Sequence, residues 1–205
     1  MKSARYLSPL WLPEAAFVLL SVLAGSGLLY GPDLFVMGAV QSMSSEPMDL
    51  VAMFLSATGS WELSGALVLA LLAALYGGGR RRIVGRLLVA FLATGLLEYL
   101  LKQFLPVPPI PPGTVKAKDF VPFATVELPY PYPSGHALRH TILLGTVYVL
   151  GRNAVLRAGI ALLLLGLLSS RVYLGVHWAS DVVGGALLGA AAVLWAFGKE
   201  SRGWT

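Results

Sequence analysis

Six apolar segments, separated by shorter polar connections, constrain the fold of this chain more than any other feature. They cover residues 11–29, 61–76, 83–101, 136–150, 155–169 and 178–197. A helix of about 20 apolar residues crosses the hydrocarbon core of a bilayer and satisfies its own backbone groups there. Only 12% of the residues are charged, about half the fraction of a soluble domain. We therefore expect an all-α, polytopic membrane protein, with a single domain over residues 1–205 and a bundle of six transmembrane helices.

The first apolar segment and the region after it need separate interpretation. Lys2 and Arg5 precede the run 11–29, as in a signal peptide, but the run is longer than a signal's apolar core and no clear cleavage site ends it. We expect a retained first helix. The pieces 34–40 and 48–55 are too short to span and are expected at the membrane interface. The alternative is one long tilted helix over residues 48–76.

Basic residues gather in the connections that would share one side of the membrane. An excess of Lys and Arg marks cytoplasmic loops, and ten of the 15 basic residues fall on that side in our assignment: Lys2, Arg5, Arg80, Arg81, Arg82, Arg86, Arg152, Arg157, Lys199 and Arg202. Both termini are then cytoplasmic, and all three histidines face the periplasm or exterior of an inner or plasma membrane. Nucleic acid is not an expected partner, because no basic stripe is interleaved with aromatic residues.

A polar turn, Pro133-Ser134-Gly135-His136, opens the fourth apolar segment. Polar and ionisable residues at membrane depth are costly and usually mark a working site. Ser134 is placed to cap a helix whose free N–H groups form an anion site, reinforced by the helix dipole. Gly135 would let the backbone approach an oxygen that a Cβ would obstruct. We predict a phosphate cradle at this turn.

A second polar group lies between the last two apolar segments. His177 and Asp181 are four residues apart and therefore on one helix face. An aspartate there can accept from one imidazole nitrogen and leave the other free to attack a phosphorus atom. Arg171 offers a planar fork that matches two phosphate oxygens.

Together these two groups resemble the second and third motifs of the type-2 phosphatidic acid phosphatase superfamily, over roughly residues 100–189. The resemblance implies a membrane enzyme that removes phosphate from a lipid through a phosphohistidine intermediate, without a metal or cofactor. It implies that His177 is the nucleophile, Asp181 its orienting partner, and His136 the acid and then the base. Arg171, Ser134 and Gly135 would hold the phosphoryl group.

The first motif of that superfamily is incomplete here. Lys102 matches its lysine, but Pro109 stands where the motif has an arginine. We hypothesise that Arg139, three residues after His136, supplies the lost positive charge to the phosphate. Lys116 and Lys118 are weaker candidates for this role.

Several interpretations remain open from the sequence. The substrates that fit are polyprenyl diphosphate, phosphatidylglycerophosphate and phosphatidate, and membrane lipids are the expected surroundings. A phosphotransferase with the same chemistry, an impaired lipid-phosphate binder and an anion or proton transporter are the alternatives. A metal site built from His136, His140, His177 and Asp181 is opposed by Arg171, whose charge would repel a cation.

Overall fold

The computed structural model describes residues 11–116 and 128–198. Within these residues it contains eight α-helices, one short 3-10 helix at Pro112–Thr114 and no strand, which confirms the all-α prediction. The helices are α1 (Leu12–Gly25), α2 (Tyr30–Gln41), α3 (Glu46–Ala57), α4 (Trp61–Gly77), α5 (Arg81–Phe104), α6 (Gly135–Leu150), α7 (Ala154–Tyr173) and α8 (Ala179–Phe197).

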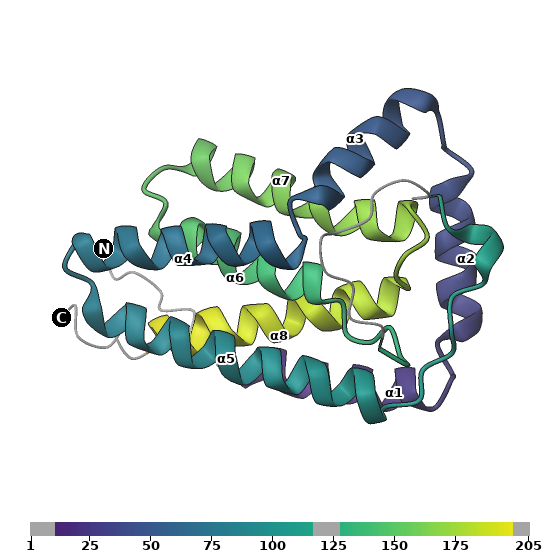
Figure 1. Cartoon of the computed structure of the whole chain (residues 1–205), viewed down its shortest axis with the longest axis horizontal. Helices are drawn as coiled ribbons and strands as arrows, with labels where there is room; N and C mark the ends of the chain where they lie inside the picture. Colours follow the sequence, from purple (N-terminus) through teal and green to yellow (C-terminus); the bar gives the residue numbers. More distant parts are fainter. Residues whose placement is uncertain (1–10, 117–127, 199–205) are drawn as a thin grey trace, which may run out of the picture.

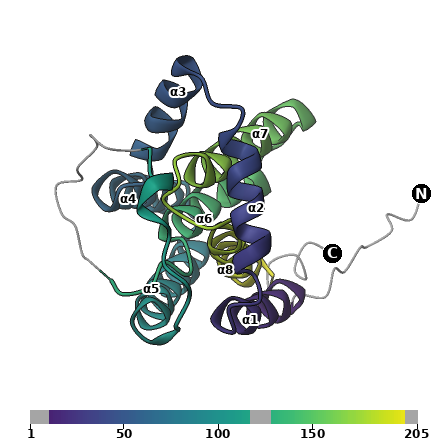
Figure 2. The ribbon, with the colours of Figure 1, turned by 90° about the vertical axis from the view of Figure 1, so that its right-hand side faces the viewer.

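Helices α6 and α8 form the centre of a bundle (Figures 1 and 2). Their mutual contact is the most extensive in the structure, and α1, α4, α5 and α7 pack around them. Helix α2 lies across one end of the bundle, and α3 extends obliquely away from it, with its contacts made to α7 (Figure 1). One end of the bundle is therefore partly covered by α2.

Three helices are long and apolar enough to cross a membrane: α5, α7 and α8. The total becomes five if each of two bent helix pairs counts as one span. Helix α6, with 16 residues, is shorter than the roughly 20 residues that a straight span needs. The described residues thus support an integral membrane protein with three to five candidate spans, rather than all six that the sequence predicted.

The two bent pairs account for the first part of the chain. The predicted helix over 11–29 ends at Gly25, and α2 continues at an angle of 97° after a turn in which Gly27 has a φ of +76°. Only glycine adopts such a φ without strain. Helices α3 and α4 meet at 56°, so residues 48–76 do not form the single long helix considered as an alternative.

Close packing of α6 on α8 depends on glycines of α8. A Cβ at Gly189 would lie 2.7 Å from Thr141 Cβ and 2.8 Å from the Leu138 carbonyl oxygen, and one at Gly185 would collide with the Ser134 carbonyl oxygen. Small residues at such crossings let helix backbones approach closely. The N-terminus of α6 is therefore seated directly against the first turns of α8.

Tyr132 anchors the loop that leads into α6. Its ring is fully buried, lies where a Cβ at Gly184 would fall, and stacks on Phe17 of α1 with 6.1 Å between ring centroids. Its hydroxyl makes a 2.9 Å hydrogen bond with Ser21. Burial raises the pKa of Tyr132 to about 12, so the phenol stays neutral at physiological pH.

Candidate active site

The two polar groups found in the sequence meet where the N-termini of α6 and α8 adjoin. The Ser134 N–H donates to the Asp181 carbonyl oxygen at 2.9 Å, which joins the two helix starts directly. Ser134 also caps α6, because its hydroxyl accepts from the Ala137 N–H at 3.4 Å. His136 follows Ser134 by two residues in the first turn of α6, and His177 directly precedes Trp178, the N-cap of α8.

The prediction that His177 and Asp181 share one helix face was wrong, because α8 begins at Ala179 and His177 lies in the turn before it. The two side chains nevertheless come into contact, since Asp181 is in the first turn of α8. His177 Nδ1 is 3.2 Å from Asp181 Oδ2, and the same oxygen accepts from the Trp178 N–H at 3.0 Å. Asp181 is 0% exposed. Because Nδ1 faces the carboxylate, Nε2 is the ring nitrogen with a lone pair to offer.

The surroundings of His177 keep its imidazole neutral. Burial holds the pKa of His177 well below its usual value of 6.5, and the positive charges of Arg171, Lys102 and Arg139 lower it further. A neutral imidazole is the nucleophilic form. The site therefore has an oriented, unprotonated histidine near neutral pH.

Arg171 lies in the last turn of α7, and its positive charge acts on His177. One of its terminal nitrogens donates to the Ser56 hydroxyl of α3. Its Nε is buried and, among the residues that the structure describes, has no hydrogen-bond partner. The same holds for Asp181 Oδ1. A buried N–H without a partner is costly, so an acceptor such as a phosphate oxygen would be bound favourably there.

Lys102 and Arg139 are brought together by a carboxylate. Glu98, which is 3% exposed, lies 3.3 Å from Lys102 Nζ and 3.5 Å from Arg139 Nη1. Arg139 is also bonded through Nε to Ser64 at 2.9 Å and through Nη2 to the Gly59 carbonyl at 3.3 Å. The guanidinium of Arg139 is therefore fixed in position by α4 and α5.

Gly135 has a structural reason to be glycine. A Cβ there would collide with Glu98 Oε1 and would lie 2.7 Å from Glu98 Cδ and 2.8 Å from Arg139 Nη1. The absent side chain thus makes room for this ion pair at the N-terminus of α6. The expectation that Gly135 also accommodates a phosphate oxygen stays a prediction.

The bend between α3 and α4 supplies contacts that the sequence analysis missed. We call residues 56–60 the elbow. Besides the Ser56 bond to Arg171, Thr58 Oγ1 lies 3.0 Å from His140 Nε2. Gly59 packs so tightly that a Cβ would collide with the His136 ring and lie 2.7 Å from His140 Cε1. The only available signal was the Thr58-Gly59-Ser60 break between two apolar runs.

Other predicted residues lie apart from this cluster. Lys116 lies 3.9 Å from Asp49 and 4.6 Å from the centroid of the Tyr173 ring, whereas Lys118 lies outside the described residues. His140 has the hydrogen-bonding role expected of it, with Thr58 as its partner. Within residues 11–116 and 128–198, no three His, Cys, Asp or Glu side chains are arranged to hold a metal ion.

Comparison with known proteins places the chain in a family. The PAP2 superfamily model matches residues 83–202, which is more than half of the chain. The chain belongs to the PAP2 superfamily. No curated protein matches it. The elbow lies before the matched region, so its contacts with the site come from outside the part of the chain that this PAP2 match covers.

Two solved structures share the fold. One is the first transmembrane PAP2 type phosphatidylglycerolphosphate phosphatase from Bacillus subtilis, with a TM-score of 0.72, 20% identity and coverage of 94% of this chain and 97% of that chain. The other is Aquifex aeolicus LpxE, with a TM-score of 0.59, 24% identity and coverage of 80% and 94%. At these identities the similarity establishes the helical arrangement alone.

Proposed function

We propose that this PAP2 protein is a membrane lipid phosphatase that works through a phosphohistidine intermediate without a metal. The observation that carries the proposal is the 3.2 Å contact between His177 Nδ1 and Asp181 Oδ2, beside the unpartnered Nε of Arg171. A protein that only bound lipid phosphate would need the arginine but not an oriented, neutral imidazole.

The reaction that we propose has two displacements. In the first, His177 Nε2 attacks phosphorus, the bond from phosphorus to the lipid oxygen breaks, and the oxygen leaves with the electron pair. His136 gives its proton to that oxygen and releases the lipid product, which is an alcohol from a phosphate monoester and a lipid monophosphate from a diphosphate. In the second, His136 takes a proton from water, the water oxygen attacks phosphorus, and the N–P bond breaks to return His177 and release inorganic phosphate.

Positive charge and N–H donors would stabilise the phosphoryl group during both displacements. We assign this role to Arg171, to Lys102, and to the α6 N-terminus at Ser134 and Gly135. Arg139 would replace the arginine that Pro109 displaces from the first motif. Its guanidinium is held in place by three partners, so its charge would act on the phosphate without a large rearrangement.

An apolar groove beside the site supports a lipid substrate. The groove lies between α3 and α7 and has a volume of about 420 Å³, within the range of about 300–1,000 Å³ common for ligand pockets. Leu55 and Ser170 in its lining directly precede Ser56 and Arg171, which bond to each other. We propose that a hydrocarbon chain lies in this groove while its phosphate reaches Arg171.

The orientation and the substrate follow from the same proposal. We infer six membrane crossings with both termini cytoplasmic, so that the site faces the periplasm or the exterior. The arginine-rich turn between α4 and α5 and the N-terminus of α8, which His177 precedes, lie at opposite ends of the bundle, in agreement with the positive-inside bias (Figure 1). A site on that face favours polyprenyl diphosphate or phosphatidylglycerophosphate over phosphatidate.

A phosphate-release screen tests the proposal. The purified protein is incubated in detergent with each of these three lipid phosphates, with and without a chelator, and His177→Ala serves as the control. We expect release from at least one lipid that persists in the chelator and is abolished in the variant. Release that survives in His177→Ala would refute the proposed nucleophile, and release lost in the chelator would refute metal independence.

A further inference from the structure

The helix that carries Asp181 has an N-cap residue whose side chain cannot accept a hydrogen bond. The N-cap of α8 is Trp178, whose indole can donate a hydrogen bond but cannot accept one. That donor is already used, because Trp178 Nε1 bonds to the Pro108 carbonyl at 2.8 Å. The first N–H groups of a helix need acceptors, which Ser, Thr, Asp or Asn at the N-cap normally provides.

Asp33 of α2 supplies this acceptor from the other end of the sequence. Its Oδ1 accepts from the Ser180 N–H at 2.9 Å, and its Oδ2 accepts from the Ser180 hydroxyl at 2.5 Å. Asp33 and Ser180 are each 6% exposed, so both bonds are shielded from water. Hydrogen bonds from neutral donors to a buried carboxylate are among the stronger ones in proteins.

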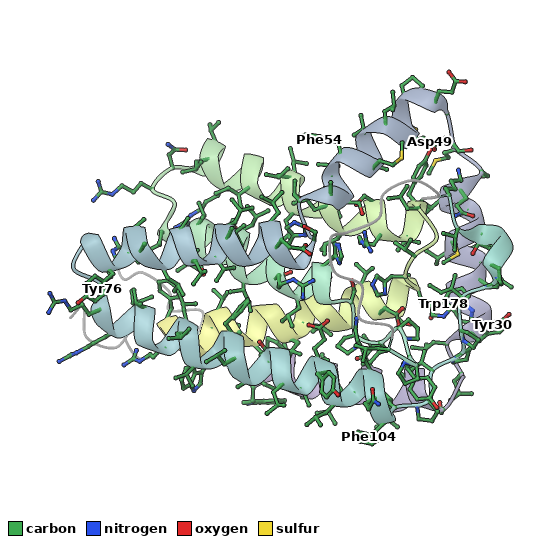
Figure 3. The ribbon with its side chains drawn as sticks, in the orientation of Figure 1. Tyr30, Asp49, Phe54, Tyr76, Phe104 and Trp178 are labelled. Carbon is green, nitrogen blue, oxygen red and sulfur yellow. The ribbon has the colours of Figure 1, made fainter. Side chains whose placement is uncertain are left out.

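A second contact from α2 reinforces the first. Tyr30 lies one turn before Asp33 and packs edge-on against Trp178, with 5.6 Å between ring centroids and 79° between the ring planes. Figure 3 shows these two side chains together at the end of the bundle that α2 covers. Helix α2 therefore holds two consecutive parts of the α8 start, the N-cap residue and the first turn.

We propose that Asp33 is a positioning residue for the reaction, which caps α8 in trans and thereby sets the distance between His177 and Asp181. This inference rests on the proposed function. Ser180 precedes Asp181 directly, and Asp181 Oδ2 is bonded to both His177 and Trp178. A shift of the first turn of α8 therefore moves the carboxylate relative to the imidazole. The loss of about 1 Å of alignment reduces turnover by about 100-fold.

The carboxylate could instead serve only to attach α2 to the bundle. The two roles differ in what they do to chemistry. An attachment role lowers the stability of the protein but leaves the folded fraction fully active. A positioning role lowers the rate of phosphorylation of His177 and leaves the KM for substrate nearly unchanged, since the cationic groups Arg171 on α7 and Lys102 on α5 keep their places.

Four variants separate these roles. Asp33→Ala removes both bonds, whereas Asp33→Asn keeps an oxygen for the Ser180 N–H and an amide that can donate to the Ser180 hydroxyl. Ser180→Ala removes only the hydroxyl bond. Glu46→Ala, which removes an exposed carboxylate at the start of α3, is the matched control.

The measurement is the single-turnover rate of phosphoenzyme formation by the full chain in detergent, over a series of concentrations of dioctanoyl phosphatidylglycerophosphate that is radiolabelled in its terminal phosphate. We expect a loss of about 100-fold in Asp33→Ala with KM within threefold, a smaller loss in Ser180→Ala, and rates within about fivefold in Asp33→Asn and Glu46→Ala. If Asp33→Ala does not fold, the other two variants decide. A lower rate of phosphoenzyme formation in Ser180→Ala, together with a nearly unchanged rate in Asp33→Asn, supports the proposal.

Two results would overturn the inference. The first is that the folded Asp33→Ala protein forms phosphoenzyme at the unmodified rate. If Asp33→Ala does not fold, the same result in Ser180→Ala takes its place. The second is that Asp33→Asn loses as much activity as Asp33→Ala. The second result would mean that the charge of Asp33 matters rather than its capping bonds. Failure of the unmodified protein to form phosphoenzyme with any lipid phosphate is a different outcome, which contradicts the proposed function itself.

Discussion

Replacing Gly59 with alanine probes the elbow directly. The new Cβ would lie 2.7 Å from His140 Cε1 and closer still to the His136 ring. Carbon atoms in contact are separated by about 3.5 Å or more, so the His140 ring has to move by about 0.8 Å and the His136 ring further. A displacement of about 1 Å in a catalytic group costs about 100-fold in rate. We expect Gly59→Ala to lower kcat by about 100-fold.

The assay is steady-state phosphate release in detergent, together with the thermal unfolding temperature of each protein. Gly65→Ala is the matched control, since it adds the same methyl group to the same region and meets no atom within 4 Å. We expect this control to keep its kcat and to gain about 0.5–1 kcal/mol of stability, because alanine favours the helix more than glycine does. A Gly59→Ala protein that folds normally and keeps its kcat within threefold would refute the account of the elbow.

Three further predictions concern the ion pair, the nucleophile and the groove. Gly135→Ala should lower the free energy of unfolding by about 1–3 kcal/mol, measured by thermal unfolding, because the new Cβ overpacks the Glu98 carboxylate. Gly95→Ala is the control, since its Cβ would meet no atom within 4 Å. Equal stabilities of the two variants would contradict the prediction. Because the pKa of His177 is lowered, chiefly by burial and then by nearby cations, its neutral form persists below pH 6.5, and the acid limb of kcat/KM should lie below that value. Lys102→Met removes one of those cations and should move the limb upwards; a limb that stays or moves down would show that Lys102 does not act on the nucleophile. Gly166→Leu places a side chain in the groove and should raise the KM of a long-chain lipid phosphate about tenfold, because about two methylenes of the lipid chain would be excluded from the groove. The KM of a dioctanoyl substrate should not change. Equal effects on both substrates would exclude the groove as the binding site of the hydrocarbon chain.

The later helices could be predicted closely because hydropathy alone decides them. The apolar segments 83–101, 155–169 and 178–197 each lie inside an observed helix or differ from it by one residue. A local signal also worked at the first motif, where Ser134 caps α6 as predicted. At the second motif the contact between His177 and Asp181 was predicted, but His177 lies before the helix and not on its face. Such features depend on short stretches of sequence, where periodicity and capping are informative.

The rest of the site depends on contacts between distant segments, which one sequence does not reveal. The Asp33 bonds to Ser180 join residues 147 positions apart, and Thr58 reaches His140 across 82 positions. The bend after α1 was visible in principle as Gly25-Ser26-Gly27, but the length of the apolar run outweighed that signal. The sequence predicted that Gly135 makes room for a phosphate oxygen. Only the structure revealed that its missing Cβ also makes room for the Glu98 carboxylate and its partner Arg139.

The central claim is that His177 becomes covalently bonded to phosphorus. The most direct measurement is to quench the protein during turnover of a radiolabelled lipid phosphate and to locate the label by peptide mapping. The account predicts an acid-labile, base-stable phosphoramidate on His177, absent from His177→Ala. A label on another residue, or phosphate released at a normal rate by the His177→Ala protein, would contradict it.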